Sequence, residues 1–168
     1  KQYPQAIQEA DEALKKYPDE RILKVIRATV LAESGQGEQA VVALKALLDG
    51  KNDRETYLSL AQAYEKMKKF AEMGKAIDAA EKLSDTKEDK EAILFTRGAM
   101  YERMKKFDLA EAEFRKLLEQ NPNNYSAMNY LGYMLADRNV RLQEAQELIQ
   151  KAVAQDPNNG AYLDSLGW

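Results

Sequence analysis

The 168-residue sequence contains no cysteine and no histidine. Disulfide bonds within the chain are therefore excluded, as are zinc sites built from Cys and His side chains. Nucleophilic catalysis in which a histidine activates a serine or cysteine is excluded for the same reason. Only four prolines and eight glycines are present, which argues against long irregular loops. These absences favour a chain made of regular secondary structure and remove the commonest catalytic chemistries.

Neither sign of charge dominates, because 25 basic side chains stand against 28 acidic ones, a formal net charge of -3. Nucleic-acid-binding domains usually carry a basic excess, since neutralisation of phosphates dominates their affinity; we therefore predict no nucleic-acid partner. Charged residues interrupt every apolar stretch well before the roughly 20 residues that a membrane-spanning helix needs, so no direct membrane insertion is predicted. The sequence starts at Lys1 without a methionine, and we expect a fragment that lacks its N-terminus.

Carboxylates are plentiful, but no motif gathers two of them in one pocket, as paired-acid hydrolysis requires. No glycine-rich phosphate loop is present. The stretch 156–159, Asp-Pro-Asn-Asn, has some likeness to a calcium loop, but it stands where a turn between helices is expected. We therefore predict no catalytic residue, no cofactor and no metal site.

An internal repeat is the strongest positive signal. Residues 65–70 read Glu-Lys-Met-Lys-Lys-Phe and residues 102–107 read Glu-Arg-Met-Lys-Lys-Phe, each after a tyrosine. Each hexapeptide is followed by an amphipathic stretch with apolar residues at helical spacing. Two helical patterns in every repeat indicate stacked helical hairpins, in which each repeat needs its neighbours to bury its apolar face. The sequence therefore predicts an all-α fold.

The apolar spacing and the helix breakers predict ten helices. Pro18, Pro122 and Pro157 end helices, because proline lacks an N–H and disfavours helix in the preceding residue. The stretches 121–124 and 156–159, Asn-Pro-Asn-Asn and Asp-Pro-Asn-Asn, offer capping side chains for the helices that follow. The predicted helices span residues 4–16, 19–34, 37–49, 54–67, 70–83, 88–104, 107–120, 124–138, 141–155 and 159–168.

The segment 91–124 fits a known pattern of small and large residues. Its positions are occupied by Leu94, Gly98, Tyr101, Phe107, Ala110, Phe114, Leu117 and Pro122. In this pattern the sequence resembles the tetratricopeptide-repeat (TPR) family, of a type common in bacteria. The resemblance implies a right-handed α–α superhelix, a TPR solenoid of four complete helical-hairpin repeats with a half repeat at each end. It makes residues 1–168 a single domain, with repeats at about 1–20 (partial), 21–53, 54–90, 91–124, 125–159 and 160–168 (partial).

The same resemblance implies where a partner binds, since TPR proteins hold peptides in a concave groove lined by the first helix of each repeat. The implied partner-binding residues are Phe95, Asn129, Tyr130, Tyr133, Trp168, Glu102, Arg103 and Gln62. Their aromatic rings offer apolar area, and an asparagine amide can pair with a peptide backbone. The alternative is that Phe95, Tyr130 and Trp168 pack between repeats and that Glu102 and Arg103 form a solvated face. Lys68, Lys69, Lys105 and Lys106 either form a small basic edge or simply keep the hairpin turns soluble.

We therefore expect a non-catalytic scaffold or adaptor that binds a protein or peptide. Two alternatives stay open: a self-assembly module that makes homo-oligomers through its terminal repeat faces, and an accessory helical domain of a larger enzyme. The clamp by which some TPR proteins hold chaperone C-termini is absent, since Leu58, Gln62, Thr96, Ser126 and Tyr130 stand at its positions. The compartment, cytoplasm or bacterial envelope, is left open.

Overall fold

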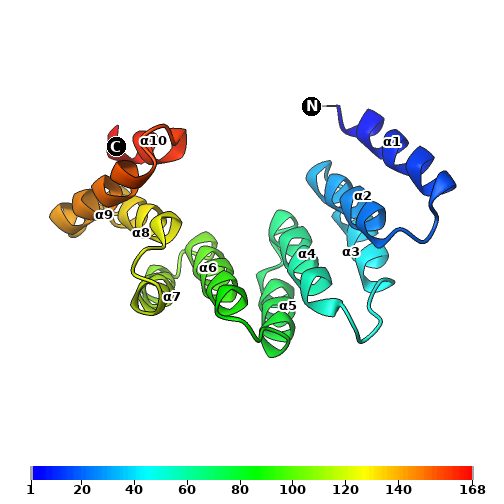
Figure 1. Cartoon of the computed structure of the whole chain (residues 1–168), viewed down its shortest axis with the longest axis horizontal. Coiled ribbons are helices and arrows are strands. Elements are labelled where there is room, and N and C mark those ends of the chain that lie inside the picture. Colours follow the sequence, from blue (N-terminus) through cyan, green and yellow to red (C-terminus); the bar gives the residue numbers. More distant parts are fainter. Residues whose placement is uncertain (1, 168) are drawn as a thin grey trace. The chain divides into compact units, whose positions relative to one another are not determined.

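A computed structural model describes residues 2–167, and this range contains ten α-helices and no strand (Figure 1). Their number agrees with the prediction from the sequence. The helices are α1 (Tyr3–Lys16), α2 (Arg21–Glu33), α3 (Gly37–Lys45), α4 (Asp53–Lys66), α5 (Phe70–Lys82), α6 (Lys87–Arg103), α7 (Phe107–Gln120), α8 (Tyr125–Asp137), α9 (Leu142–Gln155) and α10 (Gly160–Gly167).

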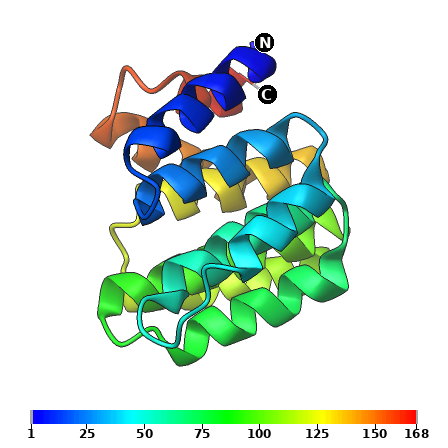
Figure 2. The same ribbon diagram turned by 90° about the vertical axis from the view of Figure 1, so that its right-hand side faces the viewer.

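The chain divides into two compact units, Lys1–Thr86 with α1–α5 and Lys87–Trp168 with α6–α10. Figure 1 colours the first unit from blue to green and the second from green to red. The division falls inside the predicted repeat 54–90, directly before α6, and the assignment of one domain to residues 1–168 stays a prediction. Within each unit the helices form antiparallel hairpins, which can be followed for α4/α5 and α8/α9 in Figures 1 and 2. None of the helices in the described part of the chain is long and apolar enough to cross a bilayer.

The duplicated hexapeptide builds the same hairpin turn twice. Lys68 and Lys105 adopt left-handed backbone conformations, with φ of 58° and 60°. The N–H of the following lysine then bonds back to the tyrosine carbonyl five residues earlier, at 2.9 Å for Lys69 and 2.8 Å for Lys106. This is the helix-ending arrangement in which a glycine usually takes the left-handed position. Gly35, with φ of 86°, takes that position in the α2/α3 turn.

The core of the second unit lies where α6–α9 cross, around the fully buried side chains of Phe114, Leu117 and Leu131. Gly98 and Gly132 are buried at these crossings. A Cβ added at Gly98 would lie 2.9 Å from the Phe114 ring, and one added at Gly132 would lie 2.7 Å from Cγ1 of Ile149. The prediction that small residues mark close helix approaches is confirmed, because no side chain fits in these gaps.

Helix α3 ends at Lys45, four residues before the predicted end at residue 49. The prediction was wrong because the helical hydrogen bonds stop after Ala46, and the N–H groups that follow find other acceptors. The N–H of Leu47 turns back to the carbonyl of Leu44 at 3.0 Å, and the Asp53 carboxylate accepts those of Asp49 and Gly50, at 2.9 and 2.8 Å. A carboxylate eight residues downstream of the helix therefore holds the loop that replaces its last turn.

Helix α2 begins at Arg21 and not at residue 19, because Glu20 keeps an extended backbone. The Arg21 guanidinium donates to the carbonyl of Leu47 at 2.8 Å and to Oγ1 of Thr56 at 2.6 Å. It also lies 3.7 Å from the carboxylate of Asp53, which is buried. Arg21 thereby joins α2 to the α3–α4 loop and to α4, which compensates for the short α3.

The two predicted caps are present. Oδ1 of Asn124 accepts the N–H of Ala127 at 3.0 Å at the start of α8. Oδ1 of Asn159 accepts the N–H of Tyr162 at 3.2 Å at the start of α10. Each side chain satisfies one of the N–H groups that a helix N-terminus leaves without an internal partner.

Candidate functional site

Two of the predicted site residues meet between the first helices of the second unit. The rings of Phe95 on α6 and Tyr130 on α8 lie edge to face, with centroids 5.6 Å apart. Both also contact the fully buried Phe114. The ring of Phe95 meets it edge to face with centroids 5.5 Å apart, and the ring of Tyr130 stacks on it with centroids 4.8 Å apart. Phe95 and Tyr130 are half-buried, so most of each ring packs against the core and only the remaining surface is open to a partner.

Three further predicted residues lie beside this aromatic pair. The hydroxyl of Tyr130 donates to Oε2 of Glu102 at 3.3 Å, which joins α8 to α6. Tyr133 is 42% exposed, and Asn129 lies one helical turn before it, so both occupy the same side of α8. We call the surface formed by Phe95, Glu102, Asn129, Tyr130 and Tyr133 the first-helix face.

Asn129 is an unusual member of this face. Its Oδ1 atom is buried, yet it accepts no hydrogen bond from any residue within the described range. A buried acceptor without a donor costs about 1–3 kcal/mol relative to a satisfied one. Helix stability therefore does not explain an asparagine at this position.

A hollow of about 440 Å³ opens between α6 and α8 at their N-terminal ends. It is lined by Glu88, Glu91, Ala92, Phe95, Thr96, Asn124 and Ser126. Of these, only Phe95 was predicted as a partner-binding residue. The signal that could have found Glu88 and Glu91 is their spacing of seven and four residues before Phe95, which places all three on one side of a helix.

Neighbouring residues fix the walls of this hollow. Oε2 of Glu91 accepts a hydrogen bond from the side-chain amide of Asn121 at 3.1 Å. The hydroxyl of Ser126 lies 3.2 Å from that of Tyr162, which links α8 to α10. The hydroxyl of Thr96 donates to the carbonyl of Ala92 at 2.8 Å. These bonds hold the side chains that shape the hollow, and two of its lining residues, Glu88 and Glu91, are acidic.

Gln62 and Arg103 stay predictions as partner-binding residues. Gln62 is exposed on α4 in the first unit. Arg103 is exposed at the C-terminal end of α6. Trp168 lies outside the described residues.

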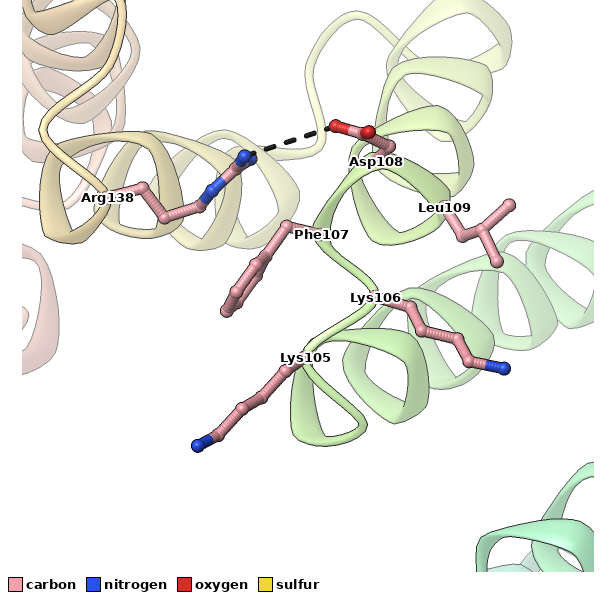
Figure 3. A pocket seen from close by; sticks show the side chains of 6 residues that line it. All are labelled: Lys105, Lys106, Phe107, Asp108, Leu109 and Arg138. Atoms are coloured by element: carbon pink, nitrogen blue, oxygen red, sulfur yellow. Dashed lines mark ion pairs between the residues drawn. The ribbon is translucent and has the colours of Figure 1, made fainter.

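The two lysines of the α6/α7 turn do not converge on one basic site. Lys105 and Lys106 line a hollow of about 350 Å³ with Arg138, but their amino groups point away from each other (Figure 3). The Arg138 guanidinium lies over the ring of Phe107, 4.8 Å from its centroid, and 4.0 Å from the Asp108 carboxylate.

Lys69 in the first unit forms an ion pair instead, with its Nζ 2.8 Å from Oε1 of Glu38. The hydrogen bond from this pair raises the pKa of the Lys69 amine. The turn lysines therefore differ in their surroundings from one repeat to the next, which favours their interpretation as solvated turn residues.

An ion-pair network ties the second helices α7 and α9 together. Nε of Arg115 bonds to Glu111 at 2.7 Å, and its Nη1 lies 2.8 Å from Glu144. Arg141, which precedes α9 in a left-handed conformation, also pairs with Glu111. Burial opposes ionisation of Glu111, but hydrogen bonds from Arg115 and Arg141 outweigh it and lower the pKa of this carboxyl. The hydrogen bond from Arg115 likewise lowers the pKa of Glu144.

This network consists of complementary pairs on the second helices, away from the first-helix face, and its arrangement is that of a structural link. No group of three or more acidic residues in the described range is placed to hold a metal ion.

Comparison with known proteins agrees with this architecture. Residues 1–107 match the family model of the Psidin N-terminal TPR repeats region, and residues 97–160 match that of the tetratricopeptide repeat. The chain belongs to the tetratricopeptide-repeat family. It is 34% identical over 140 residues to TPR repeat-containing protein PA4667 of Pseudomonas aeruginosa, a match that covers 83% of this chain and 23% of the relative. The bacterial type predicted from the sequence is consistent with this relative.

A second relative comes from an enzyme complex. The chain is 27% identical over 159 residues to the NatB auxiliary subunit N-alpha-acetyltransferase 25 of Mus musculus, covering 90% of this chain and 16% of that protein. The chain thus spans less than a quarter of the length of either relative.

Solved TPR structures share the fold. A crystal structure of MamA superposes with a TM-score of 0.64 at 20% identity, covering 92% of this chain and 89% of that one. The structure of YrrB, described as a TPR protein with an unusual peptide-binding site, gives a TM-score of 0.64 at 19% identity, covering 99% of this chain and 84% of that one. The predicted all-α solenoid of TPR repeats is confirmed by these superpositions.

Proposed function

We propose that this TPR chain is a non-catalytic scaffold that holds an extended peptide segment of a partner protein on its first-helix face. The observation that carries the proposal is the pair of Asn129 and Tyr133 on one side of α8. The first has a buried oxygen without a donor, and the second exposes an aromatic ring. An extended peptide offers apolar side chains that suit the Tyr133 ring, and backbone N–H groups that suit the Asn129 oxygen once that side chain rotates toward the open surface.

The likeness to YrrB supports a peptide as the ligand, because that protein is described as having a peptide-binding site. An accessory role in an enzyme complex is a second candidate, favoured by the likeness to the NatB auxiliary subunit. The two proposals are compatible, since an auxiliary subunit of this fold would also act by holding another polypeptide.

The test is selection of binders from a random dodecapeptide display library on the whole 168-residue chain. Peptides that are selected are then measured by fluorescence anisotropy against Asn129→Ala/Tyr133→Ala. The matched control is Gln150→Ala/Tyr17→Ala, which removes an exposed amide on α9 and an exposed ring after α1. We expect the first variant to lose measurable affinity for the peptides and the control to bind them as the unchanged chain does. Retention by both variants would place binding on another surface and refute the proposal.

A further inference from the structure

We propose that the hollow between α6 and α8 receives a lysine or arginine side chain of the bound peptide, so that the partner segment is basic. This inference rests on the proposed function and names the chemistry of its ligand. It concerns the surface lined by Glu88, Glu91, Phe95 and Thr96, which adjoins the first-helix face at Phe95.

The charged residues that line the hollow are both acidic. Glu88 lies exposed in the first turn of α6, and Glu91 lies half-buried less than one turn later. No basic side chain of the described chain is among the residues that line the hollow. The Asn121 amide holds the Glu91 carboxylate by one of its oxygens, at 3.1 Å. That amide is neutral, so the negative charge of Glu91 is left for an incoming cation.

Two side chains of the wall, those of Thr96 and Asn124, offer acceptor oxygens. The Thr96 hydroxyl donates its hydrogen to the carbonyl of Ala92, so its lone pairs are available as acceptors. Oδ1 of Asn124 already accepts one N–H, from Ala127, and a carbonyl oxygen has a second lone pair. Ammonium and guanidinium groups carry only donors, whereas a carboxylate or phosphate carries acceptors. The two carboxylates and these oxygens therefore match a cation better than an anion.

The shape of the hollow suits a long side chain. Phe95 and Ala92 supply apolar wall, and Glu88 and Glu91 supply negative charge. Lysine and arginine bury their aliphatic stems on apolar surface while the charged head stays near water and counter-charge. A volume of about 440 Å³ accommodates such a side chain.

The experiment compares two fluorescein-labelled dodecapeptides with identical leucine and tyrosine positions. One carries four arginines and the other carries four glutamates at the same places. Binding to the whole chain is followed by anisotropy at low salt, where exposed charges are least screened. We expect the arginine peptide to bind and the glutamate peptide to bind at least about tenfold more weakly. Equal affinities, or no binding of the arginine peptide, would overturn the inference.

The variant Glu88→Gln/Glu91→Gln removes both charges but keeps the acceptor for Asn121. Two partly exposed ion pairs correspond to a loss of about tenfold in affinity for the arginine peptide. The matched control, Glu119→Gln/Glu147→Gln, removes two exposed charges from the second helices α7 and α9, and we expect it to change affinity less than about twofold. An equal loss in both variants would mean that only net charge matters, and the inference would be wrong.

The two proposals fail separately. Suppose that library-selected peptides are lost by Asn129→Ala/Tyr133→Ala but bind Glu88→Gln/Glu91→Gln with unchanged affinity. The scaffold function then stands and the basic ligand is refuted. If selected peptides bind all of these variants with equal affinity, the assignment of peptide binding to the first-helix face is wrong.

Discussion

Replacing Gly132 by alanine tests whether the α8/α9 crossing is as tight as the structure indicates. The added Cβ would lie 2.7 Å from Cγ1 of Ile149 and 2.9 Å from the carbonyl oxygen of Ala145. The second contact is with backbone, so relief requires α9 to move. Overpacking of this kind costs about 1–3 kcal/mol, whereas alanine gains about 0.5–1 kcal/mol over glycine inside a helix. We expect a net loss of about 1–2 kcal/mol in the free energy of unfolding.

The assay is urea unfolding followed by circular dichroism at the helical band. Gly160→Ala is the matched control, since a Cβ there meets nothing within 4 Å, and its midpoint should stay unchanged or rise slightly. Ile149→Ala removes the clashing carbon, so its combination with Gly132→Ala should cost less than the sum of the two single changes by about 1 kcal/mol. A Gly132→Ala protein as stable as the control variant, or strictly additive costs, would refute the close approach of α8 and α9.

Three further predictions concern stability. Lys105→Gly removes the steric cost of a left-handed side-chain-bearing residue, and we expect a gain of about 0.5–1 kcal/mol in urea unfolding; destabilisation would contradict the turn geometry. Arg21→Ala leaves the buried Asp53 without its cation, and we expect a loss of about 2–3 kcal/mol, measured in the same way. The pKa of Glu111 and that of Glu144 are lowered in the folded chain. Their stabilisation is therefore present above the ordinary value of 4.5 and is lost as the pH falls through the folded-state values. On acidification, the free energy of unfolding of the wild type should fall by about 1 kcal/mol more than that of Glu111→Gln/Glu144→Gln. If the free energies of unfolding of the two proteins ran parallel with pH, the network would be excluded as a source of stability.

The helices and the repeat could be predicted from the sequence because their signals are local. Apolar spacing, proline at helix ends and small residues at crossings each act within one hairpin, and Gly98 and Gly132 lie where the pattern places them. The early end of α3 could not be predicted, since it depends on contacts with Asp53 and Arg21, which lie outside that helix. The left-handed conformation of Lys105 could not be predicted, because lysine has no preference for it.

The candidate site was predicted only in part, and the reason lies in the repeat template. The template for the third complete repeat begins at residue 91, so the first turn of α6 was counted with the preceding repeat. Glu88 was predicted to begin the helix 88–104, but it stood before the repeat positions from which the partner-binding residues were counted, although it lines the same hollow as Phe95. The template also gave each aromatic residue one role. Phe95 and Tyr130 contact the buried Phe114 and border the open surface at once.

This double role decides which residues can report on binding. Loss of the ring of Phe95 or Tyr130 would remove contacts to Phe114, and a change in affinity would then mix recognition with loss of packing. Tyr133 is 42% exposed and Glu88 is also exposed, so their replacement changes the surface more than the core. Asn129 differs again, because its unsatisfied oxygen already costs stability. Its replacement by alanine should leave the fold no weaker while a peptide that uses this acceptor is lost, which is the pattern expected of a residue kept for recognition.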